Sequence, residues 1–161
     1  MFSIKEILDI AILLETNAEA VYRRAIKEVS KPGLASLLEW MAEEEVKHAK
    51  WFSNMKNAFA SGLKNPIGDE MSHELFKDLL GKQTFSLKDT DFSQILGSSD
   101  LIAIFIEFEK DTVLFYEMLE PFIEDKDTLE QLKEIIAEEN LHIERLQELL
   151  ERKAEVAPDS A

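Results

Sequence analysis

Apolar residues recur at every third or fourth position through most of the chain, which is the spacing of an α-helix that turns one face to a core. The pattern predicts four long helices, over about residues 4–29, 32–60, 98–120 and 127–153. Capping boxes are expected to start the first helix, at Ser3 and Glu6, and the fourth, at Asp127 and Glu130. No alternating run is long enough for a strand, so the expected fold is an all-α four-helix bundle.

Residues 62–98 form a different kind of segment, because glycine, proline and short polar runs disfavour a long helix there. We expect one short helix within it, over about residues 70–80. This long connection is expected to carry the chain back across the bundle, so that the third helix starts at the end where the first helix starts. Residues 1–153 then make one domain, and residues 154–161 are expected to be a disordered tail.

Two copies of one polar signature interrupt the apolar faces. In each copy a glutamate and a histidine stand three residues apart, which places them on one face of a helix, one turn apart. Each copy also has a second glutamate 30 residues upstream of the first, and the two sets repeat with an offset of 94 residues. The members are Glu15, Glu45 and His48 in one set, and Glu109, Glu139 and His142 in the other. The third histidine, His73, lacks such an upstream partner and is expected at the surface.

The shared spacing predicts that all six side chains meet at one level of the bundle. Four buried carboxylates would be strongly unfavourable alone, since the charge of each must be removed from water. Two divalent cations would balance the four negative charges, and carboxylate oxygens with one imidazole per ion suit iron or manganese. We therefore expect two such ions, with a pair of iron ions and an iron–manganese pair both open, and with zinc a common occupant in recombinant material. The competing interpretation is a pair of polar helix faces that bind no ion.

A tyrosine follows the upstream glutamate by seven residues in both sets, at Tyr22 and Tyr116. Seven residues is close to two helical turns, so each tyrosine lies on the face of its glutamate. We expect both hydroxyl groups to support the site by donating hydrogen bonds to metal-binding carboxylates. The alternative is a pair of ordinary core aromatics, and a redox role for either tyrosine is not expected.

Composition restricts the chemistry and the partners. The chain of 161 residues has no cysteine, which excludes disulfides, thiolate catalysis and cysteine-bound iron. Its net charge of −15 disfavours nucleic acid and anionic membrane surfaces as partners. No apolar run reaches membrane-spanning length and no signal-like segment begins the chain, so the expected location is the cytoplasm. An apolar stripe on the third helix predicts either a homodimer face or packing against the long connection; it consists of Leu101, Ile104, Phe108 and Phe115.

With these motifs on four helices, residues 3–152 resemble the ferritin-like di-iron carboxylate proteins, and most closely their rubrerythrin branch. The resemblance implies an antiparallel bundle with these metal ligands: Glu15 and Glu109 as terminal ligands, Glu45 and Glu139 as bridging ligands, and His48 and His142 as one ligand per iron. Two features depart from the family pattern. The cysteine-bound iron domain of rubrerythrins has no counterpart here, and Thr112 stands where many members carry a further glutamate.

The resemblance also implies a function, in which a ferrous pair reduces hydrogen peroxide or dioxygen. Because this chain has no cysteine, the electrons would come from an external donor such as a rubredoxin-like protein. The alternative is a ferritin-like protein that oxidises and sequesters iron. A third interpretation is a structural bundle without metal.

Overall fold

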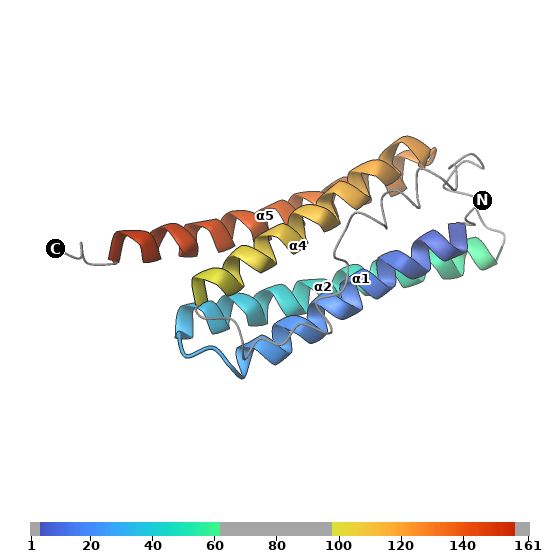
Figure 1. Ribbon diagram of the computed structural model, residues 1–161. Helices are drawn as coiled ribbons and strands as arrows, with labels where there is room; N and C mark the ends of the chain where they lie inside the picture. Colours follow the sequence, from blue (N-terminus) through green and yellow to red (C-terminus); the bar gives the residue numbers. More distant parts are fainter. Residues whose placement is uncertain (1–3, 62–97, 157–161) are drawn as a thin grey trace.

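The structure, a computed structural model, describes residues 4–61 and 98–156. These residues form four long helices and one short 3₁₀ helix (Figure 1): α1 (Ile4–Ile26), α2 (Pro32–Ala60), α4 (Ser98–Leu119), η2 (Glu120–Phe122) and α5 (Lys126–Val156). The predicted all-α four-helix bundle is therefore confirmed. The short helix expected at residues 70–80, and His73 within it, lie outside the described residues.

The helices pair as two hairpins, α1 with α2 and α4 with α5 (Figure 1). Between the hairpins, α1 runs antiparallel to α4, and α2 runs antiparallel to α5. Tyr22, near the end of α1, contacts Phe105, near the start of α4, with ring centroids 5.0 Å apart. The third predicted helix thus starts where the first one ends, and the expectation that it starts where the first one starts was wrong. The physical reason is that α2 already ends beside the start of α1. The start of α4 lies at the opposite end of the bundle, beside the end of α1 (Figure 1).

The turn between α1 and α2 forms earlier than predicted. Helix α1 ends at Ile26 rather than near residue 29, and the backbone N–H groups of Lys27 and Glu28 bond to the carbonyls of Arg24 and Ala25. Pro32 opens α2, as predicted, and its ring disfavours a helical conformation for the preceding residue. That residue, Lys31, is accordingly extended, with φ −93° and ψ 117°. Residues 27–31 therefore form the turn in which the chain reverses direction.

The start of α5 also differs from the prediction. The helix begins at Lys126, and Asp125 is its N-cap: the Asp125 carboxylate accepts hydrogen bonds from the backbone N–H and the hydroxyl of Thr128, at 3.0 and 2.7 Å. The predicted capping box at Asp127 was wrong, because Asp127 already lies in the first helical turn. At its other end α5 continues to Val156, so residues 154–156 belong to the helix and not to the predicted tail. Residues 157–161 lie outside the described residues.

The core lies between the two hairpins and is built mainly from the predicted apolar faces. Leu8, Leu14 and Val21 of α1 expose at most 3% of their surface, and burying such a side chain contributes about 1.5–3 kcal/mol. Ile12 and Ile26, which continue the apolar spacing of the same helix, are only partly buried. None of the helices within residues 4–61 and 98–156 is both long and apolar enough to cross a bilayer.

The apolar stripe predicted on the third helix, now α4, packs within the single chain. Leu101, Phe108 and Phe115 are all buried there, and Ile104 is partly buried. Residues 62–97 of the long connection lie outside the described residues. Packing against that connection and the homodimer face therefore both stay predictions.

Candidate metal centre

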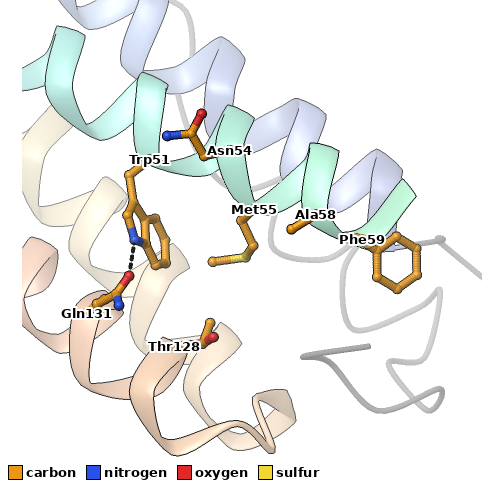
Figure 2. A pocket seen from close by; sticks show the side chains of 7 residues that line it. All are labelled: Trp51, Asn54, Met55, Ala58, Phe59, Thr128 and Gln131. Carbon is orange, nitrogen blue, oxygen red and sulfur yellow. Dashed lines mark hydrogen bonds between the residues drawn. The ribbon is translucent and has the colours of Figure 1, made fainter. Parts of the chain in front are cut away.

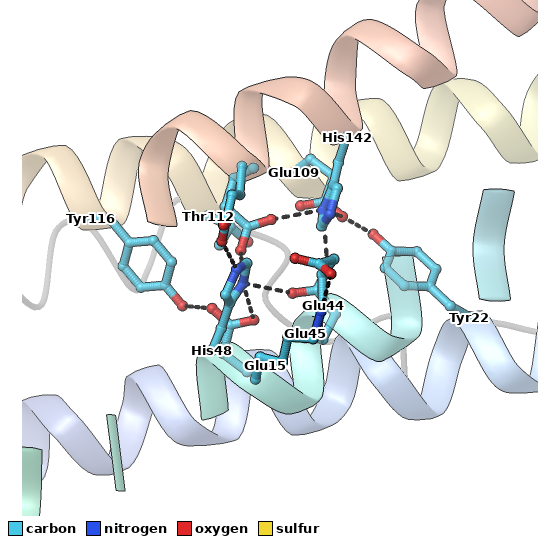
Figure 3. A network of polar contacts seen from close by, with 12 residues as sticks. Glu15, Tyr22, Glu44, Glu45, His48, Glu109, Thr112, Tyr116 and His142 are labelled. Atoms are coloured by element: carbon cyan, nitrogen blue, oxygen red, sulfur yellow. Dashed lines mark hydrogen bonds and ion pairs between the residues drawn. The ribbon is translucent and has the colours of Figure 1, made fainter. Parts of the chain in front are cut away.

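Six ionisable side chains lie in the middle of the bundle, where an apolar core would ordinarily be (Figure 3). Each of the four long helices contributes a glutamate, and α2 and α5 each add a histidine one turn further along. None of the six exposes more than 2% of its surface. The structure brings together all the residues that the sequence predicted as metal ligands, namely Glu15, Glu45, His48, Glu109, Glu139 and His142. We refer to these six residues as the glutamate–histidine cluster.

Two carboxylates lie between the two imidazoles. Glu139 turns Oε1 toward His48 Nδ1, at 2.8 Å, and Oε2 toward His142 Nδ1, at 2.9 Å. Glu45 does the same from the opposite side, with Oε2 3.4 Å from His48 Nδ1 and Oε1 3.3 Å from His142 Nδ1. Each of these two carboxylates therefore offers one oxygen to either end of the cluster.

The other two carboxylates lie at the ends. Glu15 Oε2 is 3.6 Å from His48 Nδ1, and Glu109 Oε1 is 3.7 Å from His142 Nδ1. Two donor sets result, and within each set one atom from every residue lies within 4.8 Å of the others: Glu15, Glu45, His48 and Glu139; and Glu45, Glu109, Glu139 and His142. The sequence offset of 94 residues is thus expressed as two near-equivalent sets that share Glu45 and Glu139.

Several polar atoms of the cluster lack the partners that buried polar atoms normally have. Among the described residues, Glu45 Oε1, both carboxylate oxygens of Glu139 and the Nδ1 atoms of His48 and His142 are buried without a well-directed hydrogen bond, although Glu139 and the two imidazoles lie within ion-pair distance. A buried polar atom left unpaired costs about 1–3 kcal/mol, and more for a charged group. Oxygen and imidazole nitrogen atoms aimed at one another in this way fit a divalent cation, which would satisfy them all.

Burial and the crowding of negative charge raise the pKa of two of the carboxylates. Burial, and secondarily the charge of Glu139, raise the pKa of Glu45 well above its ordinary value. The same two causes raise the pKa of Glu109 to about 7. A carboxylate in this position holds a proton easily when no cation is present.

The remaining groups shift because they face opposite charges. Burial alone would lower the pKa of His48 and of His142, but the adjacent carboxylates outweigh burial and raise the pKa of both. Burial would likewise raise the pKa of Glu139, yet the two imidazoles lower it below the ordinary value. Without a cation, protonated histidines therefore supply the positive charge that the carboxylates need.

The two tyrosines bond across the bundle rather than within their own halves (Figure 3). Tyr22 of α1 donates a hydrogen bond to Glu109 of α4, and Tyr116 of α4 donates one to Glu15 of α1. Burial, followed by the charge of the bonded glutamate, raises the pKa of both phenols well above the ordinary value, so both stay protonated as donors. Each bonded carboxylate belongs to the predicted ligands, although the periodicity placed each tyrosine only on the face of its own glutamate.

Sequence reasoning missed two further contacts of the histidines. Glu138 Oε2 lies 2.7 Å from His48 Nε2, and the ring of Trp40 stands edge-on to His142 with centroids 5.1 Å apart. The available signal was weak, because Glu138 is the last of three exposed glutamates spaced four residues apart, after Glu130 and Glu134. Thr112, the departure from the family pattern, is buried beside the cluster and bonds through its hydroxyl to the Phe108 carbonyl at 3.1 Å.

A separate hollow of about 330 Å³ lies between α2 and the start of α5 (Figure 2). Its wall is mainly apolar, with Met55 and Phe59 among the lining residues, and Trp51 closes one side by donating a 2.5 Å hydrogen bond to Gln131. None of the residues of the glutamate–histidine cluster lines it. The candidate chemistry therefore lies in the cluster and not in this hollow.

Comparison with known proteins agrees with the geometry of the cluster. No curated protein and no solved structure matches the chain. A family model described as Rubrerythrin matches residues 6–150, a range that includes the six cluster residues and both tyrosines. Because this match spans most of the chain, the protein belongs to the rubrerythrin family, which is ferritin-like and di-iron.

Proposed function

We propose that the glutamate–histidine cluster holds two iron ions and that the protein reduces hydrogen peroxide or dioxygen with electrons from an external donor. The observation that carries this proposal is the pair of near-equivalent donor sets joined by Glu45 and Glu139. One cation would satisfy one set, and only two cations would satisfy both. The rubrerythrin family match supports iron as the metal.

In this proposal each side chain has a defined position relative to the ions. Glu45 and Glu139, which offer one oxygen to each end of the cluster, would be shared by the two ions. Glu15 and Glu109 would each hold one ion at the ends of the cluster, and His48 and His142 would each contribute an imidazole to one ion. Four carboxylates balance the charge of two divalent ions, so the loaded site is neutral despite its burial.

A ferrous pair bound there would supply the two electrons that, with two protons, convert hydrogen peroxide into two waters. The protein surroundings would hold the ligands in place. Tyr22 and Tyr116 orient the two terminal carboxylates through their hydrogen bonds. The rings of Phe105, Phe108 and Phe52 pack against these tyrosines and restrict the access of water. In this proposal the electrons come from an external donor such as a rubredoxin-like protein; the 161 residues themselves contain no cysteine that could bind a second iron centre.

The proposal is tested by loading the metal-free protein with Fe(II) under anaerobic conditions and then adding peroxide or dioxygen separately. We expect two irons per chain, one peroxide consumed per iron pair, and repeated turnover once a chemical reductant is supplied. Uptake of many irons per chain would instead support iron sequestration. Well under one ion per chain would contradict both functions.

A matched pair of variants makes the test specific. Glu139→Gln keeps the shape of a side chain that both donor sets share, so we expect it to lose at least one of the two ions and the turnover. Glu144→Gln removes the same charge from an exposed position of the same helix and serves as the control. Equal metal content in the two variants would contradict the assignment of Glu139.

A further inference from the structure

The two donor sets match in the distances between the histidine Nδ1 atoms and the surrounding carboxylates. The distances from His48 Nδ1 to its three carboxylates are 2.8, 3.4 and 3.6 Å, and those from His142 Nδ1 are 2.9, 3.3 and 3.7 Å. No pair of corresponding distances differs by more than 0.1 Å. On this evidence alone the two positions would bind a cation equally well.

The surroundings of the other ring nitrogen, Nε2, differ between the same two imidazoles. His48 Nε2 lies 2.7 Å from Glu138 Oε2, and half of the Glu138 side chain, 48%, is exposed to solvent. His142 Nε2 is buried and, among the described residues, has no hydrogen-bond partner. The edge-on ring of Trp40 stands beside His142. One imidazole therefore has a carboxylate acceptor behind it, and the other has an aromatic ring in its surroundings.

The chain contains a residue that could have made the two sides alike. Glu44 is related to Glu138 by the same offset of 94 residues that relates the two donor sets. Glu44 Oε1 instead pairs with Lys47 Nζ at 2.6 Å. It also lies on the His48 side, where one atom each of Glu44, His48 and Glu138 fall within 4.8 Å of one another. Both outer carboxylates thus lie near His48.

An outer carboxylate changes how well an imidazole binds a metal. By accepting the Nε2 proton it fixes the tautomer that leaves the Nδ1 lone pair free, and it makes that lone pair more basic. Loss of such a partner typically lowers metal affinity by about 10–100-fold. An imidazole whose Nε2–H is buried without an acceptor has no such support and also bears the cost of an unpaired donor.

We propose that the two metal positions are unequal and that Glu138 makes the position containing His48 the tighter one, which fills first. This inference rests on the two-ion centre of the proposed function. The ligand class is a divalent cation that accepts oxygen and imidazole donors. Glu138 is a positioning residue, because it acts on the metal through His48 and does not touch the ion itself.

The test is a titration of the metal-free protein with Co(II), in which binding is measured by calorimetry and by the visible absorption of the bound ion. We expect two binding steps that differ at least about tenfold in affinity, with Glu138→Gln weakening the first step by about 10–100-fold. The control, Glu44→Gln, removes the related charge without touching a hydrogen bond to histidine. We expect it to change either step less than about fivefold, as for other partly exposed charges.

Two further variants assign the steps to positions. His142→Ala should keep the tight step and its absorption spectrum, whereas His48→Ala should lose both, and this comparison does not depend on how Glu138→Gln folds. Two equal steps in the unaltered protein, or equal effects of Glu138→Gln and Glu44→Gln, would overturn the inference while leaving a two-ion centre intact. Binding of well under one Co(II) per chain would overturn the two-ion centre as well.

Discussion

At the scale of single residues, the centre depends on compensation between groups that would each be unfavourable if buried alone. Glu45 and Glu109 are pushed toward their protonated forms by burial and by Glu139, while His48 and His142 are held protonated by the carboxylates. Metal binding would replace these protons with cations, because imidazole and carboxylate ligands must be deprotonated. The apparent affinity for metal should therefore rise with pH.

The same groups predict how the stability of the metal-free protein depends on pH. The pKa of Glu109 is raised to about 7 and the pKa of both histidines is raised, so the folded chain binds more protons than the unfolded chain. The free energy of unfolding should then decrease from about pH 5 to about pH 8. At lower pH the depressed pKa of Glu139 acts in the opposite direction, and its stabilising contribution is lost as pH falls.

Urea denaturation of the metal-free protein at several pH values measures this dependence. The urea midpoint should be highest near about pH 5 and fall toward about pH 8, whereas the metal-loaded protein should not lose stability over the same range. A midpoint of the metal-free protein that rises through this range would show that the cluster does not hold protons as described.

The tyrosine hydrogen bonds give a second prediction at this scale. Tyr22→Phe removes a buried donor to Glu109, and Tyr116→Phe removes one to Glu15, leaving in each case a buried carboxylate oxygen without its partner. Each change should lower the free energy of unfolding by about 1–3 kcal/mol, measured by urea denaturation. Because the two bonds are related by the internal repeat, the two variants should behave alike. A large effect of one and none of the other would show that only one of the bonds matters for stability.

At the scale of helices, periodicity was a good guide to faces and a poor guide to neighbours. The apolar period indicated which side of each helix is buried, and the 30-residue spacing placed Glu15 level with Glu45 and Glu109 level with Glu139. It could not indicate which helix each tyrosine would bond to, because that depends on how the hairpins pack. The contact of Glu138 with His48 was missed for the same reason.

The start of α5 allows the predicted cap and the observed cap to be compared directly. Asp125→Ala removes the carboxylate that accepts the backbone N–H of Thr128 and should lower the free energy of unfolding by about 1 kcal/mol. Asp127→Ala removes only a negative charge from the first helical turn, which is worth about 0.3–1 kcal/mol and is screened by salt. Denaturation at high salt should thus separate the two variants. An equal or larger loss for Asp127→Ala would restore the capping box that the sequence suggested.

At the scale of the whole molecule, the four helices and the meeting of the six cluster residues could be predicted because the chain repeats itself. The direction of the third helix could not, because no pattern within a helix records which end of the bundle it starts from. The contact of Tyr22 with Phe105 shows that α4 starts beside the end of α1. The identity of the oxidant, the electron donor and the subunit number, together with the expected cytoplasmic location, stay predictions.

Metal binding should also stabilise the molecule as a whole. At a free Fe(II) concentration about 100 times the dissociation constant, one bound ion adds about 2.7 kcal/mol to the free energy of unfolding. For a chain of this length that corresponds to a rise in the melting temperature of about 5–10 °C. Calorimetry under anaerobic conditions measures the shift, with Glu139→Gln as the variant expected to lose most of it. An unchanged melting temperature together with negligible metal content would leave a helical bundle without a metal function.

Neither hairpin supplies a full donor set. The set around His48 takes Glu139 from the second hairpin, and the set around His142 takes Glu45 from the first. A cation bound at either position would therefore tie residues far apart in the sequence into one unit, much as a disulfide does in other small proteins. In a chain without cysteine, the metal would be the cross-link that prevents the two hairpins from separating.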